Sequence, residues 1–207
     1  MFPQSFRLYL ASASPRRREL LRQIGVGFEP LLLRERAPRG PDVTEAPLPG
    51  ESPDDYVRRI CSTKVGVAWK RIVERGLVRQ PVLAADTTVC IDGQLLGKPA
   101  DRADAARMLR LLSGKTHRVL TAVAIQFGER IEIAVNDSMV RFCELSPKDI
   151  ADYIDSGEPM DKAGAYGVQG RAAAFIPELR GSYSGVMGLP LYETARLIER
   201  FAGRIGT

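Results

Sequence analysis

The segment PVLAADTTVCIDGQLLGKP, Pro81–Pro99, is the most informative part of the chain for its fold. It begins with a run of apolar and β-branched residues, which is typical of a strand buried on both faces. The dipeptide Asp92-Gly93 follows and favours a tight hairpin turn. The segment therefore predicts a buried strand that pairs with a short second strand after the turn.

Helices and strands alternate on both sides of this segment, which predicts a mixed-sheet α/β fold. A capping serine followed by proline marks three helix starts, at Ser14, Ser52 and Ser146. The expected helices are the one that begins at Pro15, then Ser52 to Arg75, Asp101 to Leu112, Ser146 to Gly157 and Leu189 to Phe201. The expected strands are Leu8–Ala11, Phe28–Leu33, and an antiparallel pair, His117–Phe127 and Arg130–Leu145, joined by a turn at Gly128. Glu158–Ile176 is expected to be a glycine-rich loop that enters a strand.

Composition indicates one globular, cytosolic domain over residues 1–207. The chain has 44% hydrophobic and 27% charged residues, and no run of residues is long and apolar enough for a membrane span. The three cysteines are far apart, so we expect each to pack as a small hydrophobe rather than to bind zinc. The net charge of +5 allows an anionic partner, but the arginines are spread along the chain, which favours a small anion over nucleic acid.

The stretch LYLASASPRRRELL, Leu8–Leu21, has the pattern of a phosphate site. A short strand, a turn of small residues and a helix start follow one another, and the free N–H groups of a helix start bind anions. Arg16 and Arg17 would add charged donors for phosphate oxygens. The alternative is a solvated basic helix end, and the local pattern does not decide between the two.

Asp86 is the residue that points most directly to chemistry. It lies inside the apolar run VLAADTTVCI, where a carboxylate needs a metal, a cation or a raised pKa. We expect a metal ligand or a general base, and the alternative is a cap on a neighbouring element. Lys64 and Lys98 are ordinary lysines in isolation, but together with the arginines and Asp86 they suit a polyphosphate with a divalent cation.

Three other motifs carry less weight. SGKT, Ser113–Thr116, lacks the first glycine of a P-loop and follows a helix instead of preceding one. GAYGVQG, Gly164–Gly170, has glycines spaced by three throughout, unlike the dinucleotide fingerprint, although its backbone could lie close to a ligand. His117 is the only histidine and has no paired nucleophile and acid, so we expect it to be structural.

Five segments together resemble the successive signatures of the Maf family of nucleoside triphosphate pyrophosphatases, in the family's order and over nearly the whole chain. They are LASASPRRRELL, AADTTVCIDGQLLGKP, LSGKTHRVLTAVAI, DKAGAYGVQG and GSYSGVMGLPLYET. The resemblance implies an elongated mixed sheet flanked by helices, with a cleft between two lobes, related to inosine triphosphate pyrophosphatases. It also implies a cytoplasmic homodimer that cleaves a nucleotide to its monophosphate and pyrophosphate with Mg²⁺ or Mn²⁺.

The resemblance assigns roles to individual positions. Asp86 matches the catalytic aspartate and a metal ligand, and Glu45 matches a second acidic, metal-binding residue. The phosphate-binding positions are Ser12, Arg16, Arg17, Lys64 and Lys98. Three positions that separate the subfamilies, Arg16, Thr87 and Gln169, resemble the branch that acts on dTTP and UTP, with clearance of non-standard nucleotides as a further role. The alternative function is a nucleotide-binding regulator of septum formation with little catalysis.

Overall fold

The computed structural model describes residues 6–34 and 40–203, and these divide into two compact units. The first unit contains residues 6–34, 40–86, 122–135 and 188–203. The second contains residues 87–121 and 136–187. Within the described residues, no helix has the length and apolar character that crossing a bilayer requires.

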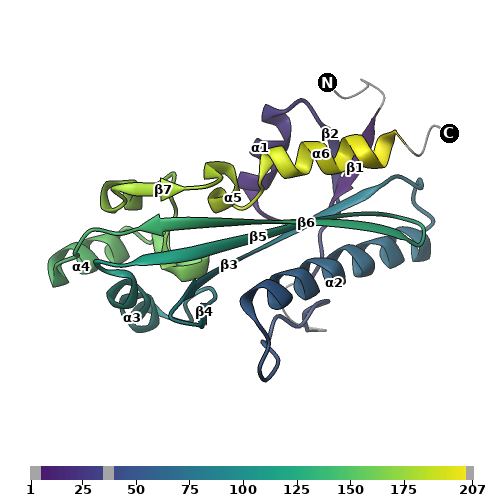
Figure 1. Ribbon diagram of the computed structural model, residues 1–207. Coiled ribbons are helices and arrows are strands. Elements are labelled where there is room, and N and C mark those ends of the chain that lie inside the picture. Colours follow the sequence, from purple (N-terminus) through teal and green to yellow (C-terminus); the bar gives the residue numbers. More distant parts are fainter. Residues whose placement is uncertain (1–5, 35–39, 204–207) are drawn as a thin grey trace. The chain divides into compact units, whose positions relative to one another are not determined.

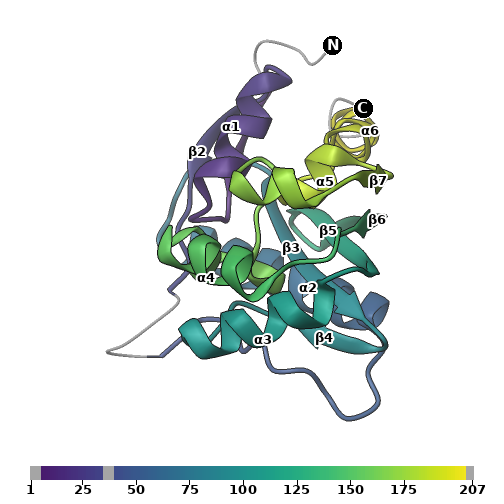
Figure 2. The same ribbon diagram turned by 90° about the vertical axis from the view of Figure 1, so that its left-hand side faces the viewer.

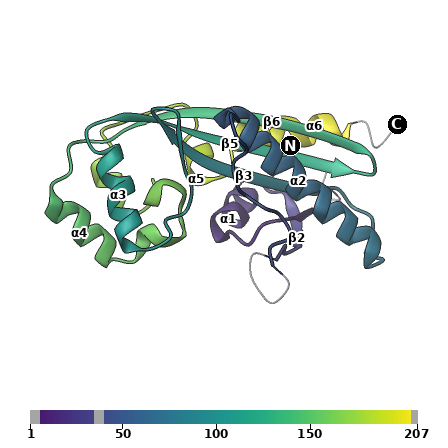
Figure 3. The same cartoon turned by 90° about the horizontal axis from the view of Figure 1, so that it is seen from below.

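The first unit is a sheet with helices on both faces. Its own elements are β1 (Arg7–Leu10), α1 (Pro15–Gln23), β2 (Gly27–Pro30), α2 (Pro53–Glu74) and α6 (Leu191–Ala202), and it shares β3 (Val82–Ile91), β5 (Thr116–Phe127) and β6 (Arg130–Arg141) with the second unit. β1 runs parallel to both β2 and β3, with Tyr9 opposite Val82. Helices α2 and α6 lie on opposite faces of the sheet (Figures 1 and 3).

The long helix α2 forms where its sequence signals predict it. The Ser52 hydroxyl accepts a hydrogen bond from the Asp55 amide at 3.1 Å, and Pro53 occupies the first helical position. Buried side chains recur at three- and four-residue spacing along it, for example Val57, Ile60 and Cys61, so one face packs into the core. The predicted helix from Ser52 to Arg75 is confirmed, and these two residues are its caps.

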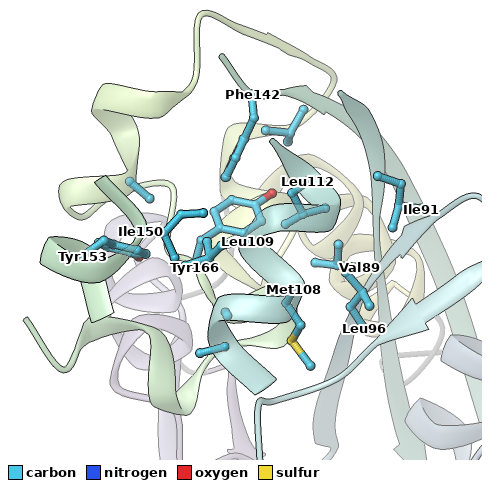
Figure 4. Close-up of a cluster of buried hydrophobic side chains, with 14 of the residues drawn as sticks. Val89, Ile91, Leu96, Met108, Leu109, Leu112, Phe142, Ile150, Tyr153 and Tyr166 are labelled. Carbon is cyan, nitrogen blue, oxygen red and sulfur yellow. The ribbon is translucent and has the colours of Figure 1, made fainter. Parts of the chain in front are cut away.

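The second unit is built around the other halves of the three shared strands. It adds β4 (Gln94–Leu96), α3 (Arg102–Leu112), α4 (Pro147–Asp155), the 3₁₀ helices η1 (Glu158–Asp161), η2 (Ala163–Ala165) and η3 (Arg171–Phe175), β7 (Glu178–Arg180) and α5 (Tyr183–Met187). Helices α3 and α4 lie side by side (Figure 2). The core between them and the strands includes Met108, Leu109, Phe142 and Tyr166 (Figure 4).

The strands follow the predicted hairpins. Over the described residues the order is β2-β1-β3-β5-β6-β7 in a seven-stranded mixed sheet, with β4 antiparallel to β3. Asp92 and Gly93 both have positive φ, at 50° and 78°, as the two-residue turn between β3 and β4 requires. The turn at Gly128 joins β5 to β6 and has φ 61°. The predicted mixed-sheet α/β fold is confirmed.

The segment Glu158–Ile176 differs from its prediction as a loop that enters a strand. It forms three 3₁₀ helices, and the apolar run RAAAF is the last of them. The run is rich in alanine, which favours helical over extended backbone, so its apolar character alone was misleading. The predicted strand Phe28–Leu33 is also displaced to Gly27–Pro30, and Cys143 is exposed instead of packed.

His117 is buried in the second unit, with only 2% of its surface exposed. Its Nε2 atom lies 2.7 Å from the Tyr166 hydroxyl, and its ring meets the edges of Phe142 and Tyr166. Burial lowers the pKa of His117 from 6.5 to about 4, because the surrounding rings do not solvate an imidazolium. The side chain is therefore neutral at physiological pH.

This buried histidine predicts a loss of stability in mild acid. Since the pKa of His117 is lower in the folded state, the unfolded chain binds more protons between about pH 6.5 and pH 4, and stability falls as the pH decreases through that window. We expect His117 to lower the free energy of unfolding, measured in urea, by about 2 kcal/mol at pH 5 relative to pH 7. His117→Phe, which has no group that titrates in this window, should lack this part of the decline. An equal decline in the variant would contradict the assignment.

Candidate functional site

The loop between β1 and α1 places Ser12 and Arg17 in contact. The Ser12 hydroxyl is buried and accepts hydrogen bonds from the Ser14 amide at 3.2 Å and from Arg17 Nη1 at 3.3 Å. Arg17 Nε donates to the Gly188 carbonyl at 2.7 Å. The Ser14 hydroxyl caps α1 and Pro15 follows it, as predicted. The guanidinium of Arg17 is thus fixed by two partners, and the alternative of a solvated basic helix end does not hold for it.

Asp86 lies in the middle of β3, with 6% of its surface exposed. It lies inside the strand and not at its end, and the side-chain caps of the described helices are other residues, so the alternative of a cap is wrong. Lys64, which projects from α2, donates from Nζ to Asp86 Oδ1 at 2.6 Å. The cation that a buried carboxylate requires is therefore supplied by the chain itself.

The ammonium of Lys64 binds a second carboxylate as well. Its Nζ atom lies 2.6 Å from Glu45 Oε1, and the Glu45 side chain is half-exposed. Burial by itself lowers the pKa of Lys64, but the carboxylates of Asp86 and Glu45 outweigh that effect and raise it. Lys64 is consequently a permanent cation that holds one buried and one accessible carboxylate close together.

Arg17 belongs to the same electrostatic cluster. Burial lowers its pKa, while the negative charges of Asp86 and Glu45 act in the opposite direction. An arginine remains charged under either influence, since its ordinary pKa lies above 12. Two cations, Arg17 and Lys64, and two anions, Asp86 and Glu45, therefore balance one another, and Arg16 adds further positive charge beside Arg17.

The backbone at Glu45 is held by two residues that sequence reasoning missed. Tyr56 donates from its hydroxyl to the Glu45 carbonyl at 3.0 Å, and Arg59 donates to the Ala46 carbonyl at 3.0 Å. Arg59 is itself paired with Glu51 at 2.5 Å. Tyr56 lies eight residues before Lys64 and so on the same face of α2, which is the signal that could have identified it.

Cys61 is buried beside these charges. Its Sγ atom lies 3.5 Å from the carbonyl oxygens of Ala84 and Ala122. Burial, together with the nearby charge of Asp86, raises the pKa of the Cys61 thiol to about 12. The thiol is therefore protonated and packs as a small hydrophobe, as predicted, and it is not a nucleophile.

The remaining predicted residues belong to the second unit. Thr87 follows Asp86 directly, and its hydroxyl accepts a hydrogen bond from Thr121 at 3.0 Å. Lys98 follows Gly97, whose carbonyl accepts from the Gly164 amide at 3.0 Å and so joins the Lys98 loop to the Gly164–Gly170 loop. Gln169 is exposed on that loop. The first unit therefore brings Arg17, Lys64, Asp86 and Glu45 together in one charged cluster. In the second unit, the loops that carry Lys98 and Gln169 are joined by a hydrogen bond.

Comparison with known proteins identifies the family. The family model described as Maf-like protein matches residues 7–201. The chain belongs to the Maf-like protein family. This Maf-like chain is 57% identical to a dTTP/UTP pyrophosphatase of Ralstonia nicotianae over 94% of both chains, and 56% identical to one of Aromatoleum aromaticum over 97% of this chain and 98% of the relative. The resemblance expected from the sequence is confirmed.

A solved structure, that of the Staphylococcus aureus Ham1 protein, is similar to this Maf-like chain with a TM-score of 0.46. The two are 12% identical, and the match covers 82% of this chain and 90% of that chain.

The two-carboxylate pairing of Lys64 predicts a strong effect on folding stability. Lys64→Met leaves Asp86 buried without its cation, which should cost about 3 kcal/mol in urea unfolding. The double variant Lys64→Met, Asp86→Asn removes the unpaired charge and should recover most of that loss.

Lys70→Met is the matched control on the same helix, because Lys70 is exposed and forms only a 3.7 Å pair with Glu74. It should change stability by less than about 0.5 kcal/mol. If the loss in Lys64→Met were no greater than in this control, the pairing would not stabilise the fold.

Proposed function

We propose that this chain hydrolyses dTTP and UTP to the nucleoside monophosphate and pyrophosphate. The observation that carries the proposal is 57% identity over 94% of the chain to a relative named dTTP/UTP pyrophosphatase. The cluster around Lys64 supports it, because it contains groups suited to binding phosphate and to deprotonating water. No observation favours the alternative of a septum regulator with little catalysis.

Phosphate binding is the role proposed for the start of α1 and for the cations near it. Ser12 and Arg17 lie at a helix N-terminus, where amide groups and the helix dipole favour an anion. Arg17 is held by Ser12 and Gly188, so little side-chain entropy is lost when a phosphate binds it. Arg16, Lys64 and Lys98 complete the proposed set of phosphate contacts.

The proposed reaction is attack of water on the α-phosphorus. The bond between the α-phosphorus and the α–β bridging oxygen breaks, and that oxygen leaves with pyrophosphate. Asp86 is the proposed general base that takes the proton of the attacking water. Lys64 keeps the Asp86 carboxylate oriented through the 2.6 Å hydrogen bond.

A divalent cation, Mg²⁺ or Mn²⁺, fits the donor set of this cluster. Among the described residues no three His, Cys, Asp or Glu side chains form a metal-binding group, but Asp86 and Glu45 approach the same Lys64 ammonium. Mg²⁺ is commonly held by one or two carboxylates together with substrate phosphates. Asp86 and Glu45 would hold the ion, which would supply positive charge to the phosphates. Because Arg17 and Lys64 are already balanced by Asp86 and Glu45, the ion would add to the positive charge that Arg16 and Lys98 offer a triphosphate.

Base selectivity is proposed for Arg16, Thr87 and Gln169. The amide of Gln169 offers both a hydrogen-bond donor and an acceptor, which matches the carbonyl and N–H groups of thymine and uracil. A glutamate at this position would offer acceptors alone when ionised. We propose that CTP is a weaker substrate and that purine triphosphates are poor ones, since mismatched polar groups are left unpaired on binding.

Assembly, location and cellular role are extensions of the same proposal. A homodimer in the cytoplasm, with clearance of non-standard nucleotides as a further role, is what the family resemblance implies. Cys61, Cys90 and Cys143 form no disulfide bond, which is compatible with a reducing compartment. Neither nucleic acid nor a membrane is proposed as a partner.

The proposed base predicts the effect of one conservative substitution. Asp86→Asn should lower turnover of dTTP by at least about 100-fold, because the amide cannot accept the proton of water. Pyrophosphate release with Mg²⁺ or Mn²⁺ measures the effect, and circular dichroism establishes that the variant is folded. Glu74→Gln, which removes an exposed carboxylate from α2, is the control and should retain normal turnover. A folded Asp86→Asn protein with near-normal turnover would show that Asp86 is not the base.

A further inference from the structure

Glu158 binds both sides of the short segment that carries Gln169. Its Oε2 atom accepts a hydrogen bond from the Arg171 amide at 3.0 Å. Its Oε1 atom accepts from the Tyr153 hydroxyl at 2.9 Å, and that hydroxyl accepts in turn from the Gly167 amide at 3.3 Å. One carboxylate thus reaches the backbone two residues before and two residues after Gln169.

Two glycines of the loop, Gly164 and Gly170, pack closely against neighbouring side chains. A Cβ atom on Gly170 would lie 2.0 Å from Glu158 Oε1, so a larger residue there would displace the carboxylate from its hydrogen bonds. A Cβ atom on Gly164 would lie 2.8 Å from Val89, which holds the start of the loop against β3. Tyr166, between them, is held by His117 within the aromatic core (Figure 4).

The exposed Gln169 contrasts with the loop that carries it. Residues 164–168 are all buried, and the hydroxyl of the buried Tyr153 accepts a hydrogen bond from the backbone amide of Gly167 in this loop. Connecting loops are ordinarily mobile and solvated. Selective hydrogen bonding to a base, by contrast, requires that the recognising side chain start from a fixed backbone position, within about 0.5 Å.

We propose that Glu158, acting with Tyr153, is a positioning residue that sets selectivity among nucleotide bases by fixing the backbone on both sides of Gln169. This inference rests on the proposed function. Neither residue contacts the reacting phosphates in this account. Loss of the carboxylate removes the acceptor of the Arg171 amide and the acceptor that holds the Tyr153 hydroxyl beside the Gly167 amide. Gln169 then no longer presents its donor and acceptor in one place, and discrimination between bases falls.

Glu158→Gln tests the inference with little change of size. Its amide has one oxygen instead of two, so either the Arg171 amide or the Tyr153 hydroxyl faces an NH₂ group that cannot accept a hydrogen bond. We expect the ratio of kcat/KM for dTTP over CTP to fall about tenfold, which corresponds to about 1.4 kcal/mol. Asp152→Asn is the matched control, because Asp152 lies on α4 and is exposed in a pair with Lys148. Its ratio should equal that of the unaltered protein.

A double variant distinguishes whether Glu158 acts by positioning Gln169 or has only a structural role. In a Gln169→Ala background, Glu158→Gln should cause no further loss of selectivity, since the side chain through which it acts is absent. A uniform decrease of kcat/KM for all nucleotides, or an additive loss in the double variant, would overturn the inference. If Glu158→Gln does not fold, Tyr153→Phe removes only the hydroxyl and should lower the same ratio.

Hydrogen exchange provides a readout that does not require catalysis. In Glu158→Gln the Gly167 and Arg171 amides should exchange faster, while amides in α3 should remain unchanged. Faster exchange with unaltered selectivity would overturn the inference and leave the proposed function intact. Absence of any hydrolysis by the unaltered protein would overturn the proposed function itself, and the selectivity claim with it.

Discussion

The ammonium of Lys64, held between the carboxylates of Asp86 and Glu45, is the interaction on which the candidate site depends. A carboxylate in the middle of a buried strand is costly unless a cation accompanies it, and α2 brings that cation across to β3. The same ammonium draws in Glu45, whose backbone is held by Tyr56. One helix thereby supplies both the charge partner of the proposed base and the anchor of the second acidic residue.

Each unit, described by itself, holds some of the residues to which the proposed function assigns a role. The first contains the phosphate-binding helix start and the charged cluster, in which each long side chain is fixed by a hydrogen bond or ion pair. The second contains the loop of Gln169, whose backbone is fixed by Glu158, Tyr153 and the His117–Tyr166 contact. In both, hydrogen bonds and ion pairs hold these groups in place, which lowers the entropic cost of binding a flexible nucleotide.

Local signals in the sequence predicted much of the fold. Ser14 with Pro15, and Asp92 with Gly93, specify a helix start and a hairpin turn through their own backbone preferences, and the structure has both. Asp86 could be identified because a charge in an apolar run is anomalous. The contacts of Glu158 could not be predicted, since they join residues up to 13 positions apart through 3₁₀ turns that have no periodic signal. The sequence indicates that Lys64 and Asp86 belong to one site, but their direct pairing, across 22 residues, depends on how α2 packs against β3 and could not be predicted.

The proposed activity of this cluster of residues is cleavage of pyrimidine nucleoside triphosphates between the α and β phosphates. The most direct measurement is product analysis of the purified, unaltered protein with a panel of nucleotides and Mg²⁺ or Mn²⁺. We expect dTTP and UTP to be consumed fastest, each yielding its monophosphate and pyrophosphate in equal amounts. Release of inorganic phosphate with a diphosphate product would contradict the proposed bond cleavage, and faster hydrolysis of 7-methyl-GTP than of dTTP or UTP would contradict the proposed specificity.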